Sequence, residues 1–130
     1  MIHGIGTDII DIKRIKKVLE KYNEKFKRKC FHKQEIARSE SKYNKVESYA
    51  KRYAAKEACA KALGTGLAKG VFWKDIEVKN KFNGKPYIVL HNNASRYLEK
   101  SFKKNAKIEL SLSDEKDFAI ANVIIFNEKK

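Results

Sequence analysis

The segment from Lys45 to Leu63 most constrains the fold of this chain, because it has the sequence of one long helix. Its second half, RYAAKEACAKAL, is rich in alanine, and neither glycine nor proline interrupts the segment. Gly64 follows where helices often end in a left-handed residue, and Gly66 keeps the backbone open beyond it. The rest of the chain is therefore expected to be organised around this helix.

One position of this helix is unusual. At helical spacing an apolar stripe runs along it, formed by Val46, Tyr49, Ala50 and Tyr53. The next position on the stripe is Glu57, and an inward carboxylate is costly unless a cation meets it. Lys61, one turn on, is one candidate partner and a metal ion is another. Alternatively, Glu57 and Lys61 form an ordinary i,i+4 pair at the edge of a packed helix.

A second carboxylate, Asp8, lies in the predicted strand Ile2–Ile10. It shares one face of that strand with Gly4 and Gly6, and glycines in a strand often mark the close approach of another backbone or a ligand. Aspartate is depleted from strands, so Asp8 calls for a reason. The alternative is that Thr7 or Asp8 starts a turn or caps the next helix.

The remaining pattern predicts an α+β domain. The Asn83-Gly84 pair is a hairpin signal, and Val71–Trp73 resembles the entry to a strand region. The other predicted elements are a helix at 11–29, a short helix within 30–44, strands at 75–78 and 87–90, a helix opened by Asn92 or Asn93, and paired strands at 108–113 and 118–126. We expect the helices to pack on a mostly antiparallel sheet, in a single domain spanning residues 1–130.

Charge points to an acidic partner. The chain has 130 residues and a net charge of +14, with 25 lysines but only five arginines. This skew argues against sequence-specific nucleic-acid binding, because base reading relies on arginine.

The sequence also bears on metal binding and location. Cys30 and Cys59 lack the spacing of a zinc site. We see no signal peptide or transmembrane span. A soluble, cytosolic protein is expected.

The predicted helix at 11–29 presents a basic face. Its exposed positions include Lys13, Arg14, Lys17 and Lys21, and Glu20 and Glu24 are its only acidic residues after Asp11. Such a face is either a solvated surface or a docking site for an acidic protein.

Four segments together resemble one family. GIGTDIIDIKRI at the start, RYAAKEACAKALGTG in the middle, NGKP at 83–86 and LSLSDEKDFAIANVII near the end are similar to the holo-acyl-carrier-protein synthases. These are the short, trimeric class of 4′-phosphopantetheinyl transferases. The resemblance spans nearly the whole chain, in the order and spacing of the family.

The resemblance implies a role for both unusual carboxylates. An enzyme of this kind moves 4′-phosphopantetheine from coenzyme A to a serine of apo acyl carrier protein, in support of fatty acid biosynthesis, and releases adenosine 3′,5′-bisphosphate. Asp8 and Glu57 match the family's Mg²⁺ ligands, and Lys61 would help to neutralise the phosphates. Glu57, directly or through a metal-bound water, is the candidate acceptor of the serine proton.

Binding residues follow from the same resemblance. The turn formed by Gly64, Thr65 and Gly66 would let coenzyme A approach the backbone. The acidic carrier protein would dock on the first helix, with Arg14 foremost and Lys13, Lys17 and Lys21 in support. Because the family's active site lies between protomers of a homotrimer, Arg52, Lys85 and Pro86, together with Gly84 and the 111–114 segment, are expected to serve a shared site.

One departure and two rival hypotheses stand beside this expectation. The family commonly has histidine after its serine motif, where this chain has Asp114. Asp114 would repel a coenzyme phosphate and could instead cap the turn. Binding of coenzyme A would then be weaker, or a nearby lysine such as Lys116 would compensate. The rivals are a small basic RNA-binding domain and a non-catalytic adaptor for an acidic protein. Neither gives a reason for Asp8 and Glu57.

Overall fold

The central helix has the predicted bounds. In the computed structural model, which describes residues 1–102 and 105–128, α4 runs from Lys45 to Leu63. Gly64 ends it with a φ of 86°, the left-handed cap that the sequence indicates. Alanines on its inner faces are fully buried and let neighbouring elements approach its backbone: Ala50, Ala54, Ala55, Ala58 and Ala60.

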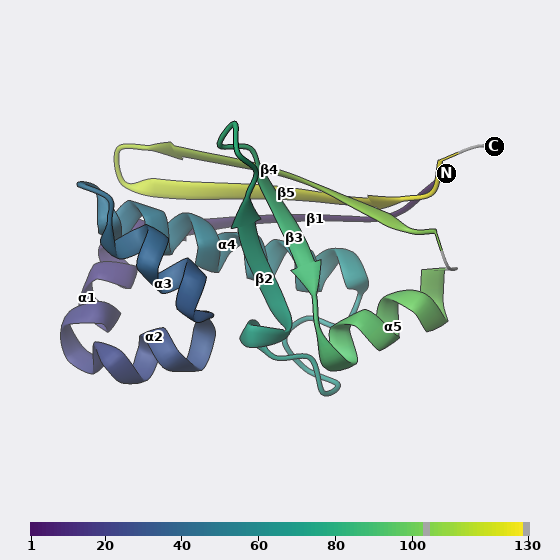
Figure 1. Ribbon diagram of the computed structural model, residues 1–130, viewed down its shortest axis with the longest axis horizontal. Coiled ribbons are helices and arrows are strands. Elements are labelled where there is room, and N and C mark those ends of the chain that lie inside the picture. Colours follow the sequence, from purple (N-terminus) through teal and green to yellow (C-terminus); the bar gives the residue numbers. More distant parts are fainter. Residues whose placement is uncertain (103–104, 129–130) are drawn as a thin grey trace.

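A three-stranded antiparallel sheet covers one side of α4 (Figure 1). Its strands are β1 (Ile2–Asp11), β5 (Phe118–Phe126) and β4 (Lys107–Glu115), in that order. Gly4 and Gly6 lie directly on α4, where an added Cβ atom would collide with the carbonyl oxygens of Ala62 and Ala58. The predicted close approach of another backbone at these glycines is confirmed.

The other two strands form a separate sheet. β2 (Ile76–Asn80) pairs with β3 (Pro86–Leu90) across a turn in which Gly84 has a φ of 91°. The strand expected at Val71–Trp73 is wrong, because Trp73–Asp75 is a 3₁₀ turn, η1. The Asp75 side chain accepts a hydrogen bond from the backbone N–H of Phe72 at 3.0 Å and closes this turn.

The predicted first helix is two helices. α1 (Ile12–Tyr22) ends at Asn23, whose φ of 42° breaks the helical path before α2 (Glu24–Cys30). Asparagine tolerates a positive φ, and the apolar periodicity continues across the break, so the sequence pattern does not reveal it. A short helix within 30–44 is confirmed as α3 (Lys33–Glu40).

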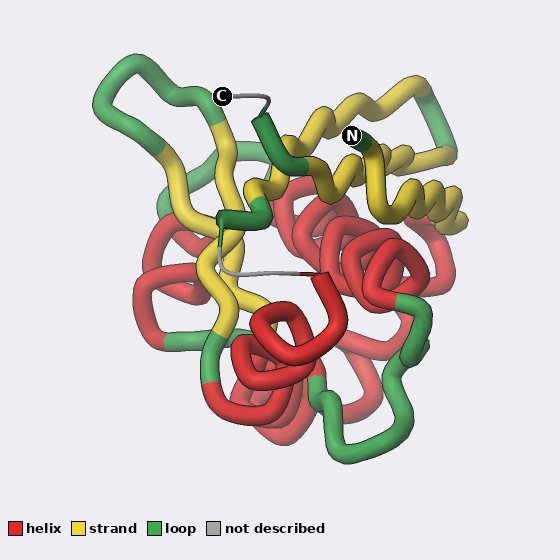
Figure 2. The backbone as a smooth tube through the Cα atoms, turned by 90° about the vertical axis from the view of Figure 1, so that its right-hand side faces the viewer, coloured by secondary structure: helices red, strands yellow, loops and turns green. Residues whose placement is uncertain are grey.

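The elements form an α+β fold, as the sequence predicts. α1, α2 and α3 lie around the first half of α4, and α5 (Asn92–Phe102) lies at the opposite end of the molecule (Figure 1). Figure 2 shows the three-stranded sheet on one side of the helices. Among the described helices, none is long and apolar enough to cross a membrane.

Candidate active site

The fold brings Asp8 and Lys61 together from β1 and α4. Lys61 Nζ lies 3.0 Å from Asp8 Oδ1 and donates a second hydrogen bond to the carbonyl of Thr7, also at 3.0 Å. The Asp8 side chain is 16% exposed and that of Lys61 52% exposed. The i,i+4 pairing of Glu57 with Lys61 is not the observed one, because the described residues pair Lys61 with Asp8. The glycines beside Asp8 set this geometry by letting β1 lie on the α4 backbone.

Glu57 shares this site as a half-buried carboxylate. Burial raises the pKa of Glu57, and the nearby charge of Asp8 raises it further. Tyr53, Lys61 and Trp73 act in the opposite direction and lower it. In turn, burial and the Glu57 charge raise the pKa of Tyr53 to about 12. The charge of Asp8 therefore acts on the carboxylate of Glu57 at the seam between β1 and α4.

This donor set fits a hard divalent cation. Both acidic groups offer carboxylate oxygens, which are the ligands that Mg²⁺ prefers. A cation between Asp8 and Glu57 would offset the repulsion that raises the pKa of Glu57. Lys61 is more than half exposed and supplies the adjoining positive charge.

Sequence reasoning missed Trp73 as a neighbour of Glu57. Its indole Nε1 is buried and makes no hydrogen bond of standard geometry within the described residues, although Trp73 lies close enough to Glu57 to lower the pKa of that carboxylate. A buried N–H donor without a partner is uncommon in folded proteins, and here it lies beside the candidate site. Trp73 is the only tryptophan of the chain, and it follows the glycine-rich segment 64–70. That position was the one signal in the sequence that could have marked it.

The Gly64–Gly66 turn follows directly after Lys61. Gly64 and Gly66 have φ values of 86° and 59°, and added Cβ atoms would meet no other group within 4 Å. Thr65 between them is buried, and its hydroxyl donates to the carbonyl of Gly66 at 2.7 Å. These glycines are therefore required by backbone conformation, and the surface over them is open.

The residues expected at a shared site form a second cluster, away from Asp8. Arg52, Gly84 and Pro86 line one cavity of about 270 Å³ together with Leu112 of β4. The buried guanidinium of Arg52 donates to the carbonyl of Val78 and the side chain of Asn80. Lys85 turns away to Glu109, at 3.2 Å. Among the described residues, the hydrogen bonds and ion pairs of Arg52 and Lys85 do not reach Asp8 or Glu57.

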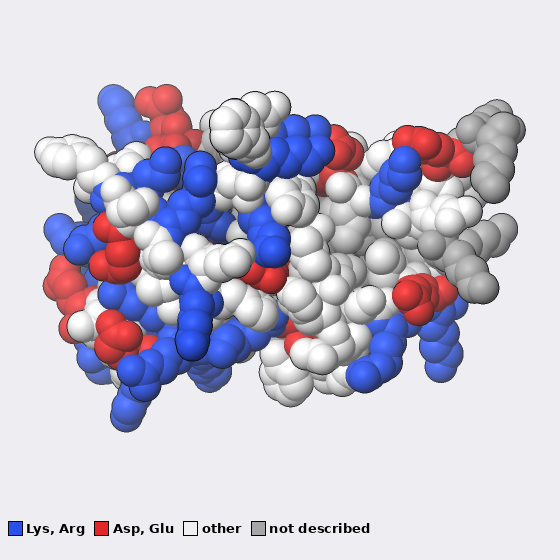
Figure 3. Space-filling model, viewed as in Figure 1, with Lys and Arg blue, Asp and Glu red and all other residues white. Residues whose placement is uncertain are grey.

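The residues predicted to dock an acidic partner are exposed on α1. They are Lys13, Arg14, Lys17 and Lys21. Figure 3 shows lysine and arginine side chains crowded over the half of the molecule formed by α1, α2 and α3. A cavity of about 400 Å³ between α1, α2 and α4 reaches Tyr53 and Trp73, the neighbours of Glu57. The basic face and the candidate site are thus adjacent.

Asp114 does not cap a turn. The last hairpin is longer than predicted, so Asp114 lies within β4 opposite Ala119 of β5, and Lys116 in the turn has a φ of 48°. Its carboxylate pairs with Lys51 of α4 at 3.1 Å. The charge of Asp114 is therefore offset by a lysine of the central helix.

Comparison with known proteins identifies the family. The model of the 4′-phosphopantetheinyl transferase superfamily matches residues 4–123. The chain belongs to this superfamily. It is 47% identical over 128 residues to the holo-[acyl-carrier-protein] synthase of Rhizobium rhizogenes, covering 98% of this chain and 96% of that protein.

Solved structures of the family share the fold. The holo-[acyl-carrier-protein] synthase of Neisseria meningitidis superposes with a TM-score of 0.88 at 35% identity, covering 98% of this chain and 100% of that one. The Helicobacter pylori enzyme, solved in complex with coenzyme A, has a TM-score of 0.81 at 32% identity, covering 94% of this chain and 99% of that one. The family resemblance inferred from the motifs is confirmed, and the alternative of an RNA-binding domain gains no support.

Proposed function

We propose that this protein transfers 4′-phosphopantetheine from coenzyme A to a serine of apo acyl carrier protein. Adenosine 3′,5′-bisphosphate is the other product. The observation that carries the proposal is the meeting of Asp8, Glu57 and Lys61 at the seam between β1 and α4, in a chain of this superfamily. A single catalytic domain spans residues 1–130.

Asp8 and Glu57 would hold Mg²⁺ in this reaction. When bound, the ion would polarise the pyrophosphate of coenzyme A and neutralise its charge. The chain itself supplies Lys61, whose exposed ammonium can turn from Asp8 toward the phosphate oxygens or the leaving group. The open surface over Gly64, Thr65 and Gly66 lies directly beyond it and would admit the coenzyme.

Glu57 would accept the proton of the attacking serine hydroxyl, directly or through a water. Burial is the largest cause that raises the pKa of Glu57, and it makes the carboxylate a better base at neutral pH. As the hydroxyl oxygen bonds to the β-phosphorus, the bond to the leaving phosphate breaks. Lys61 then stabilises the charge that develops on the released bisphosphate.

The α1 surface would receive the carrier protein. Arg14 is the central contact, with Lys13, Lys17 and Lys21 around it, and all four are exposed. Their charge complements an acidic carrier protein and steers its approach. The adjoining cavity reaches Tyr53 and Trp73, so a serine carried along this face would arrive at Glu57.

A homotrimer would complete the site. The outer face of the three-stranded sheet exposes Ile5, Ile9 and Ile124, at 64%, 60% and 39%. Exposed isoleucines on a sheet face favour contact with another copy of the chain. Arg52, Lys85 and Pro86 would then face the Asp8–Glu57 group of a neighbouring protomer and contact the coenzyme there.

We also propose that the enzyme works in the cytoplasm, in fatty acid biosynthesis.

The deciding experiment is the intact mass of an apo acyl carrier protein after incubation with the enzyme, coenzyme A and Mg²⁺. A gain of one phosphopantetheine is expected, and none with EDTA. Glu57→Gln should lower kcat by roughly 10²–10⁴-fold, while Glu47→Gln, about three turns earlier on α4, should leave it unchanged. Absence of any mass gain with folded protein and several carrier proteins would overturn the proposal.

A charge reversal tests the docking surface separately. Arg14→Glu is expected to raise KM for the carrier protein and to leave KM for coenzyme A unchanged, because only the carrier contacts α1. Lys100→Glu on α5, at the far end of the molecule, is the matched control (Figure 1). Equal effects of the two substitutions would show that net charge, and not this surface, governs carrier binding.

A further inference from the structure

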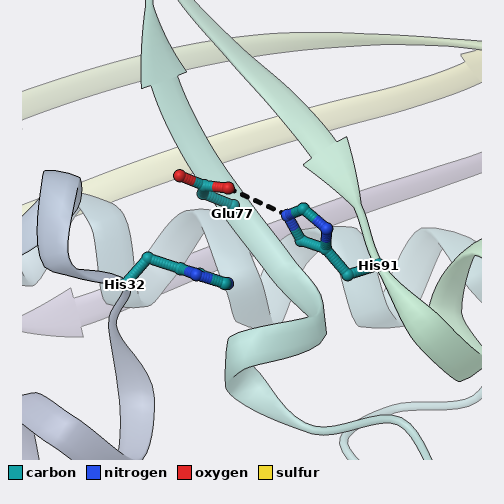
Figure 4. A group of neighbouring side chains, drawn as sticks. All are labelled: His32, Glu77 and His91. Carbon is teal, nitrogen blue, oxygen red and sulfur yellow. Dashed lines mark hydrogen bonds and ion pairs between the residues drawn. The ribbon is translucent and has the colours of Figure 1, made fainter.

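A cluster of potential metal ligands lies outside the candidate active site. His32, Glu77 and His91 each offer one ligand atom, and these atoms all lie within 4.8 Å of one another (Figure 4). The three residues come from the N-cap of α3, from β2, and from the residue after β3. No spacing in the sequence brings them together, because 45 positions separate His32 from Glu77.

We propose that His32, Glu77 and His91 bind a divalent transition-metal ion of the Zn²⁺ class, at a site separate from Asp8 and Glu57. Two imidazoles and one carboxylate form a ligand set that zinc accepts, with a fourth position left for water. Magnesium is disfavoured because it prefers oxygen ligands.

The backbone holds the three ligands in place. Glu77 lies within the β2–β3 ladder, opposite Val89, and the backbone N–H of His91 donates to the carbonyl of Asp75 at 2.8 Å. The backbone N–H of His32 donates to the buried Glu35 at 3.0 Å. Only side-chain rotation is then needed to form the site.

Each side chain is also oriented for metal binding. Nε2 of His32 donates to the carbonyl of Lys74 at 2.6 Å, which leaves a lone pair on its other ring nitrogen. Most zinc-bound histidines are held in this way. Nε2 of His91 lies 2.8 Å from Glu77 Oε1, so an ion at this point would replace a shared proton.

The present separations are close to those of a bound site. Ligand atoms around a tetrahedral zinc are about 3.3 Å apart, given metal–nitrogen distances of about 2.0–2.1 Å. The widest separation is at most 4.8 Å and must therefore shrink by no more than about 1.5 Å. Both imidazoles are partly exposed and their rings lie 5.0 Å apart, so they have room to rotate.

Nearby lysines set the electrostatic balance. His32 and Glu77 line an open cavity of about 460 Å³ together with Lys33, Lys74 and Lys79. These ammonium groups oppose a cation, but they are solvated, whereas the carboxylate of Glu77 is buried and only 7% exposed. In the described part of the chain Glu77 accepts a hydrogen bond from His91 alone, so its second oxygen is available to an ion.

The test is a titration of the full-length protein, without a histidine tag, with Zn²⁺ by calorimetry and with Co²⁺ by visible absorption. One equivalent per chain is expected, with Co²⁺ bands of low-symmetry coordination. The double variant Asp8→Asn, Glu57→Gln should bind equally well. Loss of binding in that variant would place the ion at the active-site carboxylates and overturn the proposal.

Conservative variants identify the ligands. His32→Gln and His91→Gln can still donate to Lys74 and Glu77, but each lacks the imidazole, so affinity should fall by more than the roughly 10–100-fold that loss of an outer hydrogen bond costs. His3→Gln removes the only other histidine and should bind like the wild type. Absence of stoichiometric binding, or unchanged affinity in both ligand variants, would refute the site whatever the transferase assay shows.

Discussion

At the scale of single residues, one buried ion pair joins four elements. Lys56 and Glu35 are 2.9 Å apart, and both side chains are fully buried. Lys56 also donates to the carbonyls of Trp73 and Ile76, while Glu35 accepts from the backbone N–H groups of His32 and Val78. Burial lowers the pKa of Lys56 and the charge of Glu35 opposes that shift. Because every polar atom of the pair is satisfied, the pair fixes α3, α4, η1 and β2 relative to one another.

Removing one partner of this pair should be costly. Lys56→Met leaves the Glu35 carboxylate buried without a cation, and we expect a loss of about 3–5 kcal/mol in the free energy of unfolding. Lys51 lies on the same helix as Lys56 and pairs with Asp114 of β4, and the two side chains are 29% and 32% exposed. Lys51→Met breaks that pair and should cost less than about 1 kcal/mol. Urea denaturation of both variants checks this. Similar losses in the two would contradict the role given to Lys56.

At the scale of elements, the contact between β1 and α4 depends on Gly6. Gly6→Ala would drive a methyl group into the carbonyl oxygen of Ala58, which is backbone and cannot turn aside. We expect a loss of about 3 kcal/mol in the free energy of unfolding and, because Asp8 moves with the strand, weaker binding of the proposed Mg²⁺. Gly84→Ala, where the added methyl is free, should cost only the left-handed strain of about 1–2 kcal/mol. Thermal unfolding of the two variants distinguishes these effects.

The packing of α2, α3 and α4 should depend on pH through Glu40. A hydrogen bond from Tyr49 Oη at 2.6 Å and the ion pair with Lys27 at 3.0 Å lower the pKa of Glu40. A lowered folded pKa stabilises the protein above the unfolded value of about 4.3, and this contribution is lost as the pH falls through the folded pKa. Glu40→Gln should therefore be less stable than the wild type at neutral pH, and the difference should shrink in acid. A difference that stays constant with pH would contradict this assignment.

At the scale of the whole molecule, the outer sheet face should decide the oligomeric state. Thr7 and Asn122 hydrogen-bond at its centre, at 2.8 Å, between the exposed Ile5, Ile9 and Ile124. Placing charges there, as in Ile5→Glu with Ile9→Lys, should convert the proposed trimer into monomers without unfolding the chain, because these side chains do not enter the core. Light scattering after size exclusion measures the mass. Monomeric wild-type protein would contradict the proposed trimer.

Several features could be predicted from the sequence because they depend on local chemistry. Helix propensity and the Gly64 cap determine α4, alternation and turn residues determine the hairpins, and glycines in a strand mark the approach of β1 to α4. Asp8 and Glu57 were recognised because a carboxylate in a strand and another on an apolar stripe both lack a local explanation. The resemblance of four sequence segments to one family then assigned both carboxylates to a single activity, phosphopantetheine transfer.

Tertiary structure alone decided which charged groups meet. Lys61 pairs with Asp8 and not with Glu57, Asp114 pairs with Lys51, and Lys56 pairs with Glu35, in each case across elements that lie far apart in the sequence. The same holds for His32, Glu77 and His91, whose approach follows from the docking of α3 on the β2–β3 sheet. Sequence periodicity reports which face of an element is buried, but the partner across that face is set by packing, and no local pattern encodes it.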